Sequence, residues 1–460
     1  MTPILNYRGA SVTVIGLGIE GIDLVRYLTV HGADVTVSDT RTELSLTAQL
    51  ESIADCGARL SLGANRVEDV ESADMVFVSQ GVPQDLPPLR AARRAGIPIS
   101  SMSQLFLEQC PAPVAGITGS SGKTTTTALT GAMLETAGID HVMGGNIGIG
   151  LLGLLDEIEP STTVVVELSH TQLETVDRSP ELTCVTNVTP NHLDRYSWAS
   201  YVNLKRRIFQ FQGEDDLAIF NLDDEVSAGF AEEAPGRVAF TSMLREIAGD
   251  GALLVDDAVV RREGGDDHRI LDRSEIALRG EHNVNNVLSA TAVATRLGVP
   301  DSAIAEAVRE FRGVPHRLEP VATVGGVSYV NDSIATTPER TIAGLRAFEE
   351  RIVLILGGRD KHLPLREMSS LAAERCQAVI TFGEASDLFA GAVRDARDGE
   401  RPTVDQVDDV ASAVRRAWEL AQAGDVVLFS PSGTSFDAYR TFEQRGTDFR
   451  SSVADLGGAR

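Results

Sequence analysis

The chain has 460 residues, 43% hydrophobic and 23% charged, the proportions of a globular protein with roughly two to four domains. Its 66 acidic and 41 basic side chains give a formal net charge of −25, which opposes general binding to nucleic acid or anionic lipid. The four cysteines are widely spaced and form no Cys-x-x-Cys pair, which predicts reduced thiols in a cytoplasmic protein. No apolar segment approaches the length of a membrane span.

The N-terminal part of the chain predicts a Rossmann-like domain. An apolar strand over 11–15 is followed by the loop Gly16-Leu-Gly18-Ile-Glu-Gly21, a helical pattern and a second strand over 35–38. This order is typical of a dinucleotide-binding βαβ unit, in which Asp39 falls where a ribose ligand is expected. Such a fingerprint fits NAD, another nucleotide or no ligand at all.

Residues 114–127 predict a phosphate-binding loop between a strand and a helix. The core is Gly119-Ser-Ser-Gly-Lys-Thr-Thr, and Ile117 stands where the standard P-loop has glycine. We expect the loop and the helix N-terminus to surround an anion, with Lys123 at the outer phosphates and Thr124 on Mg²⁺. The alternative is a loop that merely caps a helix, but a lysine in a first helical turn opposes the helix dipole unless an anion is present.

Strands and helices alternate along the rest of the chain and predict an α/β protein with largely parallel sheets. Residues 250–272 predict surface hairpins, and 281–297 predict a helix. Expected strands lie at 163–167, 217–223, 327–330, 352–356, 378–382 and 426–430. We therefore expect three domains in series: a Rossmann-like domain over 1–110, a central P-loop ATPase-type domain over 111–313 and a Rossmann-like domain over 314–460.

Polar residues follow several of these strands, at the sheet edge where parallel sheets bind ligands. Glu167 suits Mg²⁺ and equally suits a helix cap. The segment 187–196 contains His192, Asp194 and Arg195, and predicts either a metal or phosphate site or a cap with a surface ion pair. Lys205 follows on an expected helix, where its spacing alone indicates a solvated lysine.

Three further features fit nucleotide chemistry, each with an ordinary structural alternative. Asn283 and Asn286 share one face at a helix start, where paired amides read an adenine edge or cap the helix. Arg317 fits a transferring phosphoryl group, or a surface ion pair. The hydroxyl-rich loop over 430–437 has the composition of an anion site.

Together these motifs resemble the Mur ligase family, in order and over nearly the whole chain. They are Gly119-Ser-Ser-Gly-Lys-Thr-Thr, Glu167-Leu-Ser-His-Thr-Gln-Leu-Glu174, the segment 187–196, His282-Asn283, Pro315-His-Arg317, Asn331-Asp-Ser333 and Phe442-Glu-Gln-Arg-Gly446. The last motif, with the N-terminal Gly-Leu-Gly and Asp39-Thr-Arg41, favours the glutamate-adding member of the family.

The resemblance implies an ATP-dependent amide-forming ligase of peptidoglycan precursor synthesis. ATP would phosphorylate the alanine carboxylate of UDP-N-acetylmuramoyl-L-alanine, and the amine of D-glutamate would displace phosphate from the acyl phosphate. The resemblance further implies two Mg²⁺ sites and a carbamylated Lys205, while the first domain would hold uridine and not NAD. We expect a monomer without nucleic-acid or membrane partners.

The resemblance also assigns residues to each ligand. Those for ATP are Gly119, Ser120, Ser121, Gly122, Lys123, Thr124, Thr125, Asn283, Asn286, Arg317 and Asp332. Those for the UDP-substrate are Gly18, Asp39, Thr40, Arg41, Asn146, Ser169 and Gln172. Those for glutamate are Thr336, Lys361, Ser435, Phe436 and Phe442. Those for metal are Thr124, Glu167, His192 and Lys205, and the catalytic group comprises Lys123, His192, Lys205 and Arg317.

Three motifs depart from the family pattern. Ile334 stands where Asn-Asp-Ser-Lys-Ala-Thr-Asn has its lysine, His170-Thr171 replaces Ser-Phe in Glu-Leu-Ser-Ser-Phe-Gln, and a Ser-Pro-Ala-like loop carries Gly433-Thr434. A related ligase that adds L-glutamate is therefore an alternative. A second class, an NAD-dependent oxidoreductase or a nucleotide-binding regulator, leaves the Gly-Lys-Thr loop, Glu167 and His192 without a role.

Overall fold

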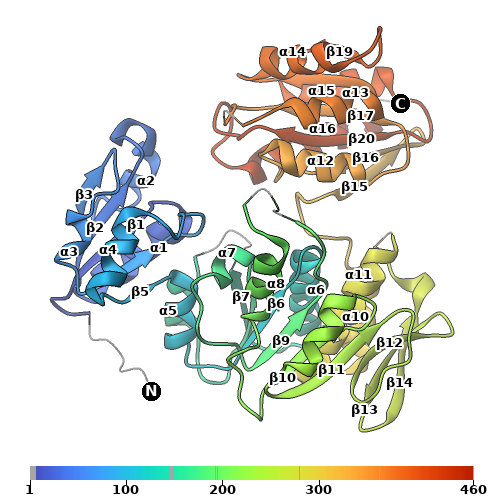
Figure 1. The fold of residues 1–460 in the computed structure, drawn as a ribbon. Coiled ribbons are helices and arrows are strands. Elements are labelled where there is room, and N and C mark those ends of the chain that lie inside the picture. Colours follow the sequence, from blue (N-terminus) through green and yellow to red (C-terminus); the bar gives the residue numbers. More distant parts are fainter. Residues whose placement is uncertain are drawn as a thin grey trace. The chain divides into compact units, whose positions relative to one another are not determined.

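One β-sheet lies in each of the three expected domains, and the sheets are largely parallel (Figure 1). The computed structural model describes residues 7–145, 150–191, 193, 195–278, 280–361 and 363–458. By contacts the chain divides into two units, Met1–Phe311 and Arg312–Arg460. The first unit contains two of the sheets and the second contains the third.

The N-terminal sheet has the strand order β3-β2-β1-β4-β5 and is parallel throughout. Its strands are β1 (Ser11–Ile15), β2 (Asp34–Asp39), β3 (Arg59–Leu62), β4 (Met75–Val78) and β5 (Ile99–Ser100). Its helices are α1 (Ile19–Val30), α2 (Thr47–Glu51), α3 (Glu68–Glu71), α4 (Pro87–Ala95) and α5 (Met102–Gln109). Leu24, Val25 and Leu28 of α1 are buried against the sheet because they recur at helical spacing.

The central sheet has the order β14-β13-β12-β11-β10-β9-β6-β8-β7. Its strands are β6 (Val114–Thr118), β7 (His141–Gly145), β8 (Thr163–Glu167), β9 (Leu182–Val185), β10 (Leu217–Asn221), β11 (Arg237–Ser242), β12 (Gly251–Val255), β13 (Ala258–Glu263) and β14 (Asp266–Asp272). Its helices are α6 (Lys123–Thr136), α7 (His170–Leu173), α8 (Trp198–Arg206), α9 (Glu225–Gly229), α10 (Glu281–Arg296) and α11 (Asp301–Glu310). All neighbouring strands from β6 to β12 pair in parallel. Strands β12, β13 and β14 form the expected antiparallel hairpins.

The C-terminal sheet has the order β15-β16-β20-β17-β18-β19, with only β15 antiparallel to its neighbour. Its strands are β15 (Glu319–Val324), β16 (Val327–Asn331), β17 (Ile352–Gly357), β18 (Cys376–Phe382), β19 (Thr403–Gln406) and β20 (Val426–Ser432). Its helices are α12 (Pro338–Arg346), α13 (Arg366–Arg375), α14 (Ser386–Ala396), α15 (Val410–Leu420) and α16 (Phe442–Gly458). Alternate residues of β17 enter two separate cores, one under α12 to α14 and one under α15 and α16, because strand side chains alternate between faces.

The predicted α/β architecture is confirmed, and strand β10 ends two residues earlier than expected. Strand β10 stops at Asn221, so Asp223 lies in the following turn. Its carboxylate accepts hydrogen bonds from Ser242 Oγ at 2.7 Å and from the Met243 N–H at 2.6 Å. Asp223 therefore anchors the segment after β11. Within the described part of the chain, no helix is both long and apolar enough to cross a membrane.

Candidate functional site

The P-loop lies at the carboxyl edge of the central sheet. Residue Ile117 of β6 pairs with Glu167 of β8, and Thr118 pairs with Val185 of β9. The residues that end these three strands therefore share one edge, as in other parallel sheets that bind ligands there. Glu167 is completely buried at this position.

Two glycines of the loop region are required by close packing. Gly122 has φ +81°, and a Cβ there would lie 2.2 Å from Asn286 Oδ1 of α10. Asn286 in turn donates to Asn283 Oδ1 at 2.9 Å. At Gly116 a Cβ would lie 2.7 Å from Pro180 Cγ. Asn286 therefore packs against the start of α6, while the N-cap of α10 is Gly280 and not an asparagine.

Asn187 fixes the conformation of the phosphate loop. Its carbonyl accepts the Ser120 N–H and its Oδ1 accepts the Ser121 N–H, both at 2.9 Å. The Thr186 hydroxyl donates to Ser121 O at 2.7 Å. These two loop amides are therefore engaged with protein. Asn187 belongs to the segment 187–196, whose sequence does not indicate this role.

Lys123 begins α6 and lies over the loop. Its Nζ donates to Gly119 O at 3.0 Å and to Ser120 O at 3.3 Å. Thr124 is buried and Thr125 is half-buried in the same helical turn. An ammonium group beside a helix N-terminus is the arrangement that suits a bound polyphosphate.

Lys205 is completely buried, so the interpretation from its spacing as a solvated lysine is wrong. Its Nζ donates to Thr118 Oγ1 at 3.1 Å and lies 5.5 Å from the centre of the Tyr201 ring. Tyr201 and Lys205 are one turn apart on α8, and both point into the protein. Burial, followed by the charge of Lys123, lowers the pKa of Lys205 well below its usual value, while Glu167 acts in the opposite direction. Burial therefore favours the uncharged form of the Lys205 amine.

The described residues fit a magnesium ion that is shared with phosphates. No three acidic, histidine or cysteine side chains within the described ranges converge as a metal site on their own. Glu167 and Thr124 instead offer one carboxylate and one hydroxyl oxygen beside the loop. Mg²⁺ prefers such oxygen ligands and commonly completes its shell with substrate phosphates and water. His192, Asp194 and Asn146 lie outside the described residues.

Ser169 and Gln172 form a capping box at the start of α7. Gln172 accepts from the Ser169 N–H at 2.9 Å and donates to Glu20 Oε1 at 3.0 Å. Gln80 donates to Ser169 Oγ at 2.8 Å, and its own N–H donates to Glu20 Oε2 at 2.7 Å. Burial raises the pKa of Glu20 although both hydrogen bonds oppose the rise. Gln172 and Ser169 thus join the N-terminal sheet to the central sheet, a role that the sequence did not indicate.

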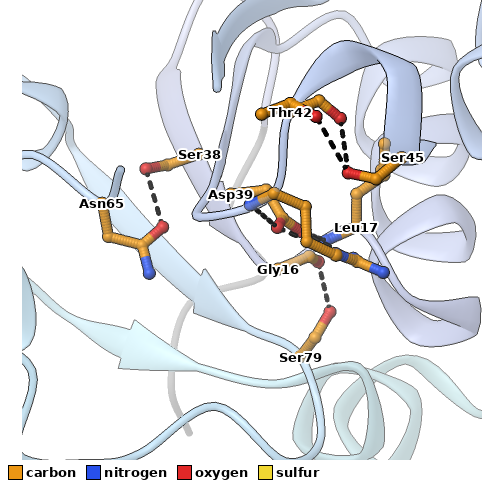
Figure 2. Close-up of polar contacts among 9 residues, drawn as sticks. Gly16, Leu17, Ser38, Asp39, Thr42, Ser45, Asn65 and Ser79 are labelled. Carbon is orange, nitrogen blue, oxygen red and sulfur yellow. Dashed lines mark hydrogen bonds and ion pairs between the residues drawn. The ribbon is translucent and has the colours of Figure 1, made fainter. Parts of the chain in front are cut away.

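The N-terminal fingerprint centres on Asp39 (Figure 2). One carboxylate oxygen accepts the Leu17 N–H at 2.8 Å and Arg41 Nη2 at 2.7 Å, and the other accepts Arg41 N at 2.9 Å and Arg41 Nε at 3.0 Å. Burial alone would raise the pKa of Asp39, but these hydrogen bonds from Arg41 and Leu17 outweigh it and lower the pKa. All four lone-pair directions of the carboxylate are filled, so it has none left for the ribose diol of NAD. Thr40 is exposed beside it, and a Cβ on Gly18 would meet nothing within 4 Å, so a ligand has room there.

Asp332 is a buried acid of the C-terminal unit. Its Oδ2 accepts Ser430 Oγ at 2.8 Å and its Oδ1 accepts the Leu318 N–H at 3.2 Å. Burial raises the pKa of Asp332 to about 7, against the opposing effects of Ser430 and of the charges on Arg317 and Arg340. Arg317 is exposed, yet it is close enough to Asp332 for its charge to lower the pKa of that carboxyl group.

The predicted glutamate residues lie on three loops and at the start of α16 in the same unit. Lys361, on the loop after β17, donates from Nζ to Thr336 Oγ1 at 3.2 Å. The Ser432 N–H donates to Ala335 O at 2.8 Å, which joins the loop after β16 to the end of β20. Ser435 follows on the loop after β20 and is buried, whereas Phe436 is 64% exposed. Phe442 is half-buried, with its ring 6.0 Å from that of His316.

Arg445 holds the loop after β16 and the loop after β20 together. It belongs to the motif Phe442-Glu-Gln-Arg-Gly446, whose sequence does not indicate this role. It is completely buried and donates to Ser333 Oγ at 3.1 Å, to Ser333 O at 2.9 Å and to Gly433 O at 3.0 Å. Burial lowers the pKa of Arg445 to about 10. A Cβ on Gly433 would lie 2.7 Å from Gly357 O, which explains the glycine at this departure from the family pattern.

The fold and these sites define a ligase that uses ATP, and the chain belongs to the Mur ligase family. Residues 10–101 match the MurD-like N-terminal domain of Mur ligases, 117–294 match the Mur ligase middle domain and 316–433 match the Mur ligase glutamate ligase domain. Among its relatives, the UDP-N-acetylmuramoylalanine–D-glutamate ligase of Symbiobacterium thermophilum is 42% identical, over 96% of this chain and 97% of that protein. The ligase of the same name from Acetivibrio thermocellus is 38% identical, over 98% and 97%.

Solved structures agree on the fold. The UDP-N-acetylmuramate–alanine ligase of Thermotoga maritima has a TM-score of 0.54 and 18% identity, and the comparison covers 97% of this chain and 99% of that one. A pseudomurein peptide ligase type C from Methanothermus fervidus has a TM-score of 0.52 and 18% identity, with 97% and 100% covered. The family resemblance and the three-domain α/β fold predicted from the motifs are therefore confirmed.

Proposed function

We propose that this protein is the ligase that joins D-glutamate to UDP-N-acetylmuramoyl-L-alanine at the expense of ATP, in peptidoglycan precursor synthesis. The observation that carries the proposal is the similarity, over nearly the full length, to relatives that bear this name. The loop over 119–125 beside Glu167, and the buried amine of Lys205, support the proposal.

The reaction proceeds in two transfers. The γ-phosphoryl group of ATP moves to a carboxylate oxygen of the substrate alanine, which releases ADP and gives an acyl phosphate. The amine of glutamate then attacks the acyl carbon, phosphate leaves with the electron pair of the C–O bond, and the amine loses a proton to solvent. Such a reaction depends mainly on positioning and on neutralisation of charge. Lys123 and the first turn of α6 hold the outer phosphates in this scheme.

Mg²⁺, when bound, neutralises phosphate charge during the transfer. Thr124 and Glu167 supply one hydroxyl and one carboxylate oxygen for it, and we place His192 at a second site. Lys205 supports the second site if it carries CO₂ as a carbamate, in which the amine nitrogen bonds to carbon and one proton is lost. Only the uncharged amine reacts in this way, and burial favours this form by lowering the pKa of Lys205.

The remaining assignments are part of the proposal. Nucleotide contacts come from the loop residues Gly119 to Thr125, from Asn283 and Asn286, and from Arg317 and Asp332. Uridine and the muramoyl-alanine arm use Gly18, Asp39, Thr40, Arg41, Asn146, Ser169 and Gln172, and within this set Asp39 acts by positioning Arg41. Glutamate uses Thr336, Lys361, Ser435, Phe436 and Phe442. We further propose domains over 1–110, 111–313 and 314–460, and a cytoplasmic monomer.

The test measures ADP release with UDP-N-acetylmuramoyl-L-alanine and each glutamate enantiomer at equal concentration. We expect turnover with D-glutamate at a rate well above that with L-glutamate. A preference for L-glutamate would assign the protein to the related ligase that adds that enantiomer. ADP release that does not depend on glutamate, or a preference for another amino acid, would disprove the assignment.

A further inference from the structure

The loop after β16 lacks the lysine of the family pattern, because Ile334 occupies that position. The main chain of Ile334 is nevertheless bonded to a cation. Its carbonyl oxygen accepts two hydrogen bonds, from the Thr336 N–H at 2.9 Å and from Arg340 Nη1 at 3.0 Å. The Thr336 hydroxyl accepts Lys361 Nζ at 3.2 Å. A guanidinium and an ammonium group are thus attached to one short turn.

This turn is held in place on both sides. The Ile334 N–H donates to His316 O at 3.1 Å, and Ala335 O accepts the Ser432 N–H at 2.8 Å. Arg340 belongs to the first turn of α12, and its N–H donates to Thr337 O at 3.1 Å. The Arg340 side chain is exposed, so a solute can reach it. The position of its charge is therefore set by secondary structure and remains accessible.

The charge of Arg340 acts on the neighbouring residues. Burial, followed by the charge of Arg340, lowers the pKa of Lys361. The charge of Arg340 also acts to lower the pKa of Asp332. The like charges of Arg340 and Lys361 repel each other, and a bound carboxylate relieves the repulsion.

We propose that Arg340 binds a carboxylate of the incoming glutamate and supplies the positive charge that the family pattern places at residue 334. This inference rests on the proposed function and adds a specificity-determining residue to it. Arg340 and Lys361, on either side of Thr336, suit an amino acid with two carboxylates. A guanidinium can bind a carboxylate through two parallel hydrogen bonds, which distinguishes it from a neutral side chain.

Kinetics of four variants test the proposal. Arg340→Ala removes the side chain, and Arg340→Gln keeps a donor for the Ile334 carbonyl but removes the charge. Arg346→Ala is the matched control, because Arg346 is exposed on the same helix and pairs with Glu367 at 3.2 Å. We expect both Arg340 variants to raise the KM for glutamate roughly 10- to 100-fold, the cost of a charge-assisted hydrogen bond. The KM values for ATP and the UDP-substrate, and all values for Arg346→Ala, should change less than about twofold.

The fourth variant moves the charge back to residue 334. Ile334→Lys in the Arg340→Ala background should restore most of the affinity for glutamate. The proposal is overturned if Arg340→Gln behaves as wild type, if Arg340→Ala matches Arg346→Ala, if the KM for ATP rises as much as that for glutamate, or if Ile334→Lys restores nothing. A wild-type protein that does not use glutamate would instead contradict the proposed function itself.

Discussion

The Nζ atom of Lys205 lies 3.1 Å from the Thr118 hydroxyl, and the lysine side chain is completely buried. Burial removes water from the ammonium group and so raises the free energy of its charged form. This desolvation lowers the pKa of the amine. The Thr118 hydroxyl donates its hydrogen bond to the Leu168 carbonyl at 2.6 Å. The lysine side chain is therefore held in one place, beside the loop over 119–125.

Lys205→Ala should lose activity by at least about a hundredfold, because the proposed carbamate contributes a metal ligand. Added formate or acetate should restore part of the rate by supplying a carboxylate to the same space. Arg206→Ala is the control, since Arg206 lies next on α8 but pairs with Glu233. Full activity of Lys205→Ala in bicarbonate-free buffer would contradict the carbamate.

Gly122→Ala should weaken ATP binding at least about tenfold. The new Cβ would lie 2.2 Å from Asn286 Oδ1, and φ of +81° strains any residue with a side chain. Gly391→Ala on α14 is the control, because a Cβ there meets nothing within 4 Å and the residue is helical. The control should bind ATP normally and gain up to about 1 kcal/mol in stability. Calorimetric titration with ATP measures the affinity of both variants. Equal affinities would show that a Cβ at residue 122 does not disturb ATP binding.

Asp332→Asn should change how stability depends on pH. The pKa of Asp332 is about 7 in the folded protein, against an ordinary value of 3.8. The folded state thus binds this proton more tightly, and wild type loses stability as the pH rises from about 4 to about 7. The variant lacks this loss, so its stability relative to wild type should increase by up to about 4 kcal/mol across that window. Denaturant unfolding of both proteins at several pH values measures the difference, and a constant difference would contradict the prediction.

Arg445→Met should destabilise the C-terminal unit by about 3 kcal/mol or more, because the carbonyls of Ser333 and Gly433 lose a buried donor. Arg450→Met on the same helix is the control. Arg450 is 38% exposed and pairs with Glu319 at 3.1 Å, so its removal should cost about 1 kcal/mol or less. The two variants are compared by the loss of hydrogen-exchange protection in β16 and β20. Similar losses would show that Arg445 does not hold the loops.

The sequence by itself determined the class of fold and the phosphate loop. Local patterns predict both: apolar strand segments alternate with helical segments, and glycines precede Lys123 at the start of a helix. These features depend on residues that are close in the chain, so their spacing is visible before folding. The family motifs extended the same local information to the order of the three domains.

Only the tertiary structure decided what several polar side chains do. Lys205 has the spacing of a solvated lysine, yet α8 packs it into the interior, where burial lowers the pKa of its amine. Gln172 resembles a ligand residue, yet its amide joins Glu20, more than 150 positions away in the chain. Arg340 gains its proposed role only because a turn brings it to the Ile334 carbonyl. Burial and partners of this kind depend on contacts between distant segments, and no local pattern encodes them.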